Sequence, residues 1–340
     1  MIKKKPLAVS GIMAVLCFCL MFMGAPVAGS NKIKLCRNDT KGHLKILIDG
    51  QLALEYQYSG TGDLPHLWPV NSPTGKNMLV QQTEPYPHHR SFWFADTIRL
   101  NGRREVSTYN ALYSGEKEGE QTYKAPFRDH IRHQEFSRCE ATDNRAVIDT
   151  KLVWEMDYDK PVLDEKRHMV VTALGKGEYL IDILFILTSS YGEVDFVSDA
   201  VHYAWPYIRI HPQFSGDNGG IITSDSNTKG QEATNMKTAL WIDYSNTLEG
   251  KTEGMAVFQF PDGKSHRWLT REYGTFGPRR PDYQSGKPFR LKKGKSLSQR
   301  VGIFVHRGDV KTGRVAERYL EYIKIGGKWE EKVEKEENGK

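Results

Sequence analysis

The residues best suited to chemistry form a run at positions 88–94, in which His88, His89 and Arg90 precede Trp93. Imidazole groups exchange protons near neutral pH, and guanidinium groups bind hydroxyls and carboxylates. If a strand already starts at His88, the two histidines point to opposite faces and do not chelate one metal ion, although a turn before the run could bring them together. A histidine pair without cysteine or carboxylate at ligand spacing is a weak metal signal, so we expect no metal and no cofactor.

A second candidate run lies at positions 201–211, where aromatic residues lead into an arginine. Read as a strand, this run places on one face Tyr203, Trp205, Tyr207, Arg209 and His211. Flat apolar surfaces next to cationic donors suit a sugar, whose ring stacks while its hydroxyls or a carboxylate accept hydrogen bonds. The alternative is that these aromatic side chains belong to the core and that Arg209 only caps the end of the strand.

A third run, at positions 266–280, holds Arg271, Glu272 and Tyr273. An arginine, a carboxylate and a phenol within three residues could serve general acid–base catalysis. The alternative is a structural Arg271–Glu272 pair beside a loop. The candidate catalytic residues are therefore His88, His89, Arg271 and Tyr273. The candidate substrate-binding residues are His66, Arg90, Trp93, Tyr203, Tyr207 and Arg209.

The elements that must position these residues are mostly β-strands. Apolar and polar residues alternate on both sides of Asp49-Gly50, a dipeptide typical of a two-residue hairpin turn. Strand-like runs bounded by Gly, Asn, Asp or Pro occur at 45–48, 52–58, 91–100, 146–158, 168–173, 179–187, 201–211, 239–244, 254–260 and 300–306. Helical spacing of apolar residues appears at 310–325. Many strands without strand–helix alternation predict an all-β antiparallel sandwich with a short C-terminal helix.

The N-terminal segment 1–29 has the layout of a secretory signal peptide, with three lysines, an apolar run and then a cluster of small residues. We expect cleavage near residues 28–30 and an exported protein, periplasmic or extracellular, with no membrane contact after the signal is removed. The formal net charge of +6 includes these three lysines, so the mature chain carries +3. No basic stripe predicts a nucleic-acid partner.

The remaining chain is predicted to form a single domain over 30–327, followed by a charged flexible tail at 328–340. Its length would permit one or two domains, and the continuous strand pattern favours one. Cys36 and Cys139 are the cysteines outside the signal segment. They could form a disulfide in an oxidising compartment or remain free thiols, and the sequence leaves both alternatives open, as it does the oligomeric state.

Several motifs of the chain resemble the family known as methane oxygenase PmoA-like. They are, in chain order, 65–69 (PHLWP), Thr74-Gly75, 87–90 (PHHR), 92–94 (FWF), 241–244 (WIDY), 254–258 (GMAVF), 270–274 (TREYG) and 304–309 (FVHRGD). The resemblance extends over about 44–325. The chain departs from the family pattern at Pro85, where an acidic residue is frequent, and at Ser91, where a glycine is common.

The resemblance implies a secreted β-sandwich of the galactose-mutarotase-like or jelly-roll-like type. A membrane monooxygenase subunit needs several spanning helices, and this sequence has none after its signal, so the family label does not describe the activity. The resemblance implies instead a carbohydrate-active enzyme, a glycoside hydrolase, lyase or epimerase, whose partner is a sugar or an oligosaccharide.

In this hypothesis His88 or His89 acts as general acid or base, and Tyr273 donates a second proton. The arginines that would bind hydroxyls or a uronic carboxylate are Arg90, Arg209 and Arg271. The first alternative is a non-catalytic carbohydrate-binding protein that uses the same aromatic face. The second is a metal-dependent oxygenase in line with the family label.

Overall fold

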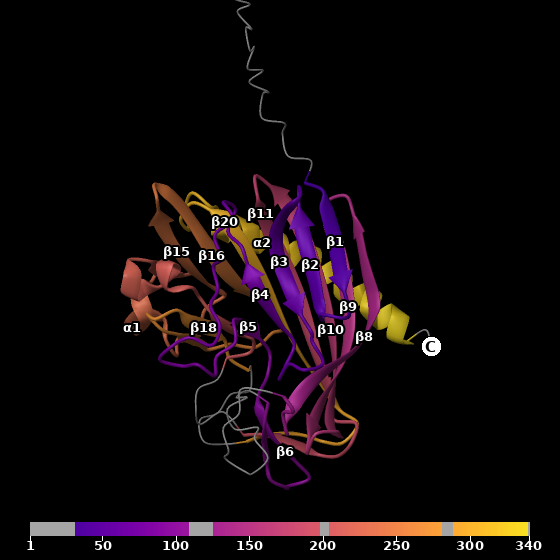
Figure 1. Ribbon diagram of the computed structural model, residues 1–340. Coiled ribbons are helices and arrows are strands. Elements are labelled where there is room, and N and C mark those ends of the chain that lie inside the picture. The colour runs from indigo at the N-terminus through magenta and orange to yellow at the C-terminus, as the bar shows by residue number, and fades with distance from the viewer. Residues whose placement is uncertain (1–30, 109–124, 198–203, 281–287, 339–340) are drawn as a thin grey trace, which may run out of the picture.

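In the part of the chain that the structure describes, two eight-stranded sheets pack face to face as a sandwich (Figure 1). The computed structural model describes residues 31–108, 125–197, 204–280 and 288–338, with side chains described as far as residue 326. The front sheet, which faces the reader in Figure 1, contains in spatial order β1 (Ile33–Asn38), β2 (His43–Ile48), β3 (Gln51–Gln57), β4 (His66–Val70), β5 (Phe92–Trp93), β13 (Tyr207–Arg209), β18 (Thr275–Pro278) and β17 (Trp268–Thr270).

The back sheet contains in spatial order β14 (Ile221–Ser224), β15 (Trp241–Leu248), β16 (Lys251–Gln259), β20 (Ser296–Arg307), β11 (Glu178–Thr188), β10 (Lys160–Gly175), β9 (Arg145–Met156) and β8 (His130–Thr142). A smaller sheet has the order β19 (Phe289–Leu291), β12 (Val194–Phe196), β6 (Thr97–Leu100) and β7 (Glu105–Ser107). The described strand pairs are antiparallel. The predicted all-β antiparallel sandwich is therefore confirmed.

The core between the two large sheets is built from the inward side of each strand. On β2, Leu44, Ile46 and Ile48 are buried and alternate with more exposed residues. Aromatic rings join the sheets across this core: Phe94 stacks on Phe185 with 4.1 Å between ring centroids. Since successive strand residues point to opposite faces, the neighbours of these buried residues lie on the outer face of the front sheet.

The predicted hairpin at Asp49-Gly50 is confirmed. It joins β2 to β3, and both turn residues have positive φ, 50° at Asp49 and 81° at Gly50. Two consecutive positive φ values are the requirement of a type I′ turn, and Asn, Asp and Gly tolerate them best.

The C-terminal helix α2 (Val315–Asn338) covers the outer face of the back sheet, as Figure 1 shows behind β16 and β20. Val315, Tyr319 and Tyr322 pack against Phe258 and Phe304 of that sheet in a second apolar cluster. The helix begins five residues later than the sequence predicts. It also continues past residue 325, so its backbone extends through most of the segment expected to be a flexible tail.

Two predicted strands differ from the structure. The run 91–100 is split, because β5 ends at Trp93 in the front sheet and β6 begins at Thr97 in the small sheet. The run 201–211 contributes only the three residues of β13 within its described part. Strand β8 was not expected from the sequence; it is an edge strand whose exposed positions lack clear alternation.

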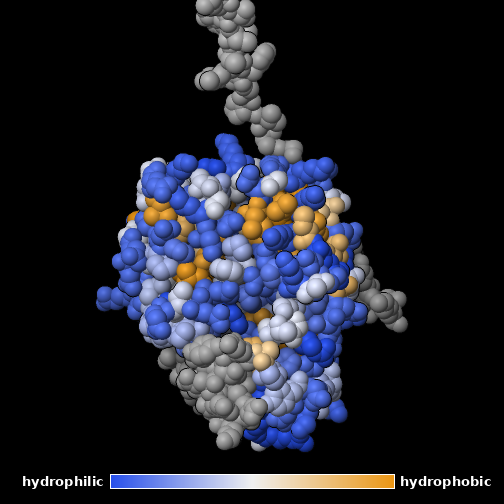
Figure 2. All heavy atoms as spheres, viewed as in Figure 1, coloured by the Kyte–Doolittle hydropathy of each residue, from blue (hydrophilic) through white to orange (hydrophobic). Residues whose placement is uncertain are grey.

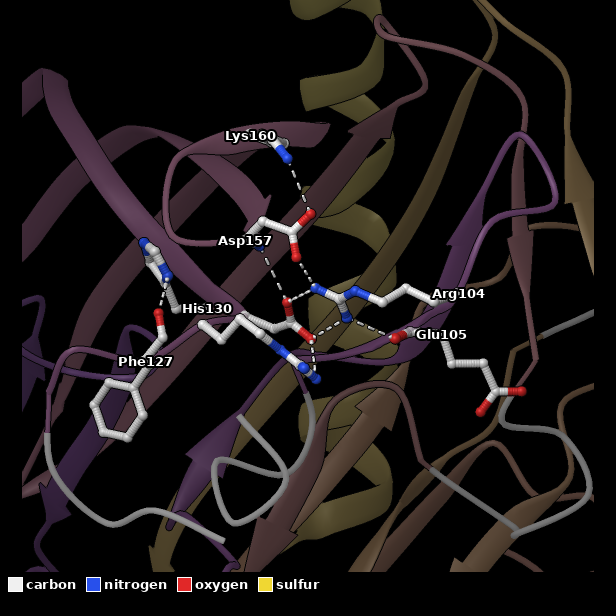
Figure 3. A network of polar contacts seen from close by, with 8 residues as sticks. Arg104, Glu105, Phe127, His130, Asp157 and Lys160 are labelled. Carbon is white, nitrogen blue, oxygen red and sulfur yellow. Dashed lines mark hydrogen bonds and ion pairs between the residues drawn. The ribbon is translucent and has the colours of Figure 1, made fainter. Parts of the chain in front are cut away.

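A network of charges ties the small sheet to the back sheet (Figure 3). Arg104, which precedes β7, donates to both carboxylate oxygens of Asp129 at 2.7 and 2.6 Å and to Asp157 at 2.6 Å. Asp157 also accepts a bond from Lys160 at 3.3 Å. These ion pairs hold the start of β7 against the β9–β10 turn.

The outer face of the front sheet is largely hydrophilic, with hydrophobic patches over β1 to β3 (Figure 2). No helix in the described part of the chain combines the length and hydropathy needed to cross a membrane. Cys36 and Cys139 are both free thiols, which decides between the two alternatives left open by the sequence. The expected signal segment 1–29 lies outside the described residues.

Arg167 and Glu165 form a buried ion pair on β10. Glu165 also accepts a bond from the indole of Trp154 at 2.7 Å, and Arg167 donates to the carbonyl of Pro65 at 3.2 Å. Removing one partner of a buried pair leaves an uncompensated charge in a medium of low dielectric constant.

We predict that Arg167→Met lowers the free energy of unfolding by about 3–5 kcal/mol. The control is Arg138→Met, which breaks an exposed pair with Glu140 on β8 and should cost less than about 1 kcal/mol. Urea denaturation followed by circular dichroism measures both. Equal losses for the two variants would contradict a structural role of the buried pair.

Candidate functional site

The candidate site lies on the outer face of the front sheet, where β5 pairs with β13. Trp93 is opposite Tyr207, and Phe92 is opposite Ile208. Phe92 and Ile208 belong to the inward side, so alternation sends Trp93 and Tyr207 outward. Figure 1 shows β5 and β18 in the lower part of the front sheet.

A loop over residues 83–89 folds back onto this outer face. Before this loop the chain runs beside the end of β13, where Val80 donates its N–H to the carbonyl of Arg209 at 3.1 Å. The loop is closed by two bonds: Gln82 N–H to the carbonyl of His89 at 2.8 Å, and His89 N–H to the carbonyl of Tyr86 at 3.0 Å. This closure places both histidines above the sheet, rather than on a strand as one prediction assumed.

The loop and the sheet together form a histidine–aromatic cluster, whose members are Tyr86, His88, His89, Trp93, Tyr207, Arg209 and Tyr273. His89 is central: it stacks on Tyr86 at 4.9 Å and contacts the rings of Trp93 at 5.6 Å and Tyr207 at 5.4 Å between centroids. The His88 ring meets the His89 ring edge-on at 4.5 Å.

Tyr273 joins the cluster from the turn between β17 and β18. Its ring centroid lies 5.2 Å from that of Tyr86. The guanidinium of Arg209 lies 4.4 Å from the Tyr273 ring centroid and 5.7 Å from that of Tyr86, and it donates to the hydroxyl of Thr275 at 3.1 Å. A buried cation over two phenol rings is stabilised by their quadrupoles.

Burial and this cation together keep the imidazoles neutral. Burial, followed by the charges of His88 and Arg209, lowers the pKa of His89 to about 2. Burial, followed by the charge of Arg209, also lowers the pKa of His88. The pKa of Tyr273 is raised, mainly by burial. Near neutral pH the cluster thus offers neutral imidazoles beside a protonated phenol.

One side of the cluster reaches solvent. Tyr86 is 36 % exposed, whereas His89 is 4 % and Arg209 3 % exposed. His88 and Tyr273 are intermediate. A ligand arriving from solvent therefore meets the rings of Tyr86 and Tyr273 and the imidazole of His88 first, with His89 and Arg209 behind them.

The structure does not bring every predicted site residue into this cluster. Arg90 turns to Asp63, donating through its Nε at 3.1 Å and through a terminal nitrogen at 2.5 Å. Arg271 donates to the carbonyl of Thr270 at 3.1 Å and acts on Tyr273 through its charge. Arg90 therefore belongs to an ion pair outside the cluster, whereas Arg271 lies beside Tyr273 at the border of the cluster.

Two further predictions concern neighbouring residues. His66, on β4, is paired with Trp93 of β5. The His66 side chain is buried, and its Nδ1 donates to the carbonyl of Leu64 at 3.0 Å. Trp205 does not share a face with Tyr207: its indole donates to Asp96 at 2.8 Å and packs on Phe94 in the core. The alternative that aromatic residues of this run belong to the core is thus correct for Trp205. Tyr203 lies outside the described residues.

The residue that sequence reasoning missed is Tyr86, which lies in the same motif as the two histidines. It was overlooked because an exposed tyrosine next to two prolines is typical of an ordinary surface loop. No local pattern predicts that Asp63 binds Arg90, since the two residues are 27 positions apart in the chain. Within the described residues, no three His, Cys, Asp or Glu side chains are grouped so that they could hold a metal ion.

A family model matches residues 43–320, and it describes a family of unknown function (DUF6807). The chain belongs to the DUF6807 family. This finding corrects the family expected from the sequence, because the matching model does not indicate a methane oxygenase PmoA-like family. A comparison with curated protein sequences found no significant match to this DUF6807 chain.

Solved structures similar to this DUF6807 chain include three carbohydrate enzymes. One is the GH36 α-galactosidase from Geobacillus stearothermophilus in complex with 1-deoxygalactonojirimycin, with 9 % identity and a TM-score of 0.39, covering 82 % of this chain and 41 % of that one. Another is galactose 1-epimerase from Lactobacillus acidophilus, with 11 % identity and a TM-score of 0.36, covering 82 % and 99 %.

The third is a heparan sulfate lyase HepC mutant from Pedobacter heparinus, with 8 % identity and a TM-score of 0.30, covering 78 % of this chain and 30 % of that one. This chain thus spans less than half the length of the α-galactosidase and of the lyase.

The buried histidine next to the cluster predicts a pH dependence of stability. Burial, followed by the charge of Arg90, lowers the pKa of His66 to about 4 in the folded state, against about 6.5 in an unfolded chain. Between these two pH values the unfolded state binds more protons, so stability falls as the pH falls through this window, by up to about 1.4 kcal/mol per pH unit for this group.

We therefore expect His66→Gln to show a shallower loss of stability than the unsubstituted protein between about pH 6.5 and pH 4. Urea denaturation at a series of pH values measures the difference. Above about pH 7.5 the two curves should run parallel, because the imidazole is neutral in both states there. Curves that stay parallel down to pH 4 would contradict the proton linkage of His66.

Proposed function

We propose that this protein is a carbohydrate-active enzyme that binds a sugar at the histidine–aromatic cluster and moves protons on it. The observation that carries the proposal is the convergence of Tyr86, His88, Arg209 and Tyr273, from three separate segments of the chain, on one partly exposed patch. A neutral base, a phenolic acid and a cation next to flat rings are what proton transfer on a sugar requires.

Binding is assigned to the rings and the cation. The exposed Tyr86 ring and the neighbouring Tyr273 ring offer an apolar surface for one face of a pyranose. Arg209 behind them favours a ligand that carries a carboxylate, since its charge acts over a few ångströms in a partly desolvated site. A uronic sugar therefore fits better than a neutral one.

Catalysis is assigned to His88 and Tyr273. A base works best when its pKa is close to the working pH, and His89, with a pKa of about 2, is too weakly basic for that role. His89 is instead a neutral hydrogen-bonding partner for a sugar hydroxyl. His88, nearer to solvent, takes the proton from the carbon next to the carboxylate, and Tyr273 returns a proton to the departing oxygen or to the opposite face of that carbon.

This chemistry describes a lyase or an epimerase. Glycoside hydrolysis usually requires two carboxylates that flank the bond. In the described structure the cluster is made of imidazoles, phenols, an indole and a guanidinium, and the nearby Glu272 accepts the backbone N–H of Gln231 at 2.7 Å. That carboxylate therefore holds the first turn of helix α1 (Gly230–Thr234).

The test is a thermal-shift screen of the purified protein against neutral and uronic mono- and oligosaccharides, with each hit examined by mass spectrometry for chemical change. We expect a uronic sugar to raise the melting temperature by mass action and to be converted. His88→Gln and Tyr273→Phe should each lower turnover by a factor on the order of 100 or more, because each removes a proton-transfer group.

The control is Tyr191→Phe, which removes an exposed hydroxyl bonded to Asp164 at 2.8 Å and should leave turnover unchanged. A rise in melting temperature without a product would favour a non-catalytic sugar-binding protein over an enzyme. Unchanged turnover in both cluster variants would overturn the assignment of the site.

We also propose that the chain is exported, which rests on the charged, apolar and small-residue order of segment 1–29. When the full chain is expressed in a bacterium, the mature protein should appear in the periplasm or the medium. N-terminal sequencing should place its first residue at about position 29–31. Recovery of the uncleaved chain from the cytoplasm would contradict export.

A further inference from the structure

A pocket lies beside the β2–β3 hairpin of the front sheet, apart from the histidine–aromatic cluster. It has a volume of about 460 Å³ and is bounded by this hairpin, by residues 71–75 after β4, by the β10–β11 turn and by Arg307 at the end of β20. In Figure 1 the β2–β3 hairpin lies at the upper end of the sandwich, whereas β5 and β18 lie lower. The volume is in the range of pockets that bind small molecules.

The walls of this pocket are held in place before any ligand binds. Glu253, which is 2 % exposed, accepts bonds from the Ser72 hydroxyl at 2.8 Å and from the N–H and hydroxyl of Thr74 at 2.9 and 2.7 Å. Gly177 has a φ of 81°, and a Cβ on it would lie 2.8 Å from the carbonyl oxygen of Pro73. The two loops are thus packed backbone against backbone, which limits the entropy lost on binding.

Arg307 is oriented by backbone carbonyls. Its Nε donates to the carbonyl of Lys176 at 2.7 Å, and a terminal nitrogen donates to the carbonyl of Pro73 at 3.3 Å. Within the part of the chain that the structure describes, the side chains of Arg307 and Lys176 form no ion pair with a carboxylate. Two cations therefore face one pocket, and the protein's own anions do not neutralise them by direct contact.

The rest of the lining determines the kind of anion. Asp49 also lines the pocket and accepts the N–H of Lys32 at 2.9 Å, and the carboxylate of Glu178 accepts the backbone N–H of Arg307 at 2.9 Å. With these carboxylates close to the two cations, the pocket suits a monoanion better than a dianion. Leu52 and Ala53 supply an apolar wall, and the amide side chains of Gln51 and Asn71 can bond hydroxyls.

We propose that this pocket binds a small hydroxylated monocarboxylate of the hexuronate type. Its carboxylate is held by Arg307 and Lys176, and its ring packs against the apolar wall. Arg307 is suited to this role because a guanidinium already fixed by two carbonyls presents its remaining N–H groups to a planar carboxylate with little further ordering. The inference does not depend on the function proposed for the histidine–aromatic cluster.

The experiment is isothermal titration calorimetry of the purified protein with sodium D-glucuronate, and with D-glucose as the neutral probe. We expect glucuronate binding that weakens as the salt concentration rises, and no comparable binding of glucose. Arg307→Gln should weaken it by roughly tenfold or more, and Lys176→Gln should weaken it to a lesser degree. Arg138→Gln, which removes a cation from the edge strand β8, should bind as the unsubstituted protein does.

The variant Tyr86→Ala distinguishes binding at the histidine–aromatic cluster from binding at the Arg307 pocket. If the cluster also binds glucuronate, Tyr86→Ala removes one binding event and Arg307→Gln removes the other. The inference is overturned if the protein binds no glucuronate at millimolar concentration, if glucose binds equally well, or if Arg307→Gln with an unchanged melting temperature binds as tightly as the unsubstituted protein. Failure of the cluster to convert a sugar would leave the Arg307 result unaffected.

Discussion

The pairing of β5 with β13 decides which side chains can meet at the candidate site. Trp93 opposite Tyr207 and Phe92 opposite Ile208 assign one pair to the solvent side and the other to the core. A slip of one residue would exchange these faces and move the cluster into the interior. The register is held because Phe94, just past β5, stacks on Phe185 of the back sheet, so the sandwich core determines the geometry of its own outer face.

Burial on that outer face then determines protonation. The loop over 83–89 covers His89 with the ring of Tyr86, while Arg209 approaches from the sheet. Loss of water and a nearby positive charge both disfavour an imidazolium, and loss of water also disfavours a phenolate. The cluster is consequently neutral apart from its guanidinium. The described side chains of the cluster thus combine neutral rings with one guanidinium.

The long strands could be predicted because a long run of strand-forming residues between turn residues is a local sequence signal. Runs such as 179–187 and 254–260 became β11 and β16 since each extends over many residues and has turn residues at both ends. Short strands lack that redundancy. β5 has two residues and β13 three, and their ends depend on where the chain leaves one sheet for another, which no local pattern records. The sequence did not predict β8, because this edge strand buries few side chains on either face and therefore shows no clear apolar alternation.

From the sequence alone, the fold class followed, as did the hairpin at Asp49-Gly50 and the concentration of imidazole, phenol and guanidinium groups in three runs. These are local properties, which follow from composition, from the alternation of apolar and polar residues, and from turn residues. Only the tertiary structure decided that Arg90 turns to Asp63, that Trp205 enters the core and that Tyr86 completes the cluster. Such choices depend on contacts between segments far apart in the chain, whose energy exists only once both sheets have closed on a common core.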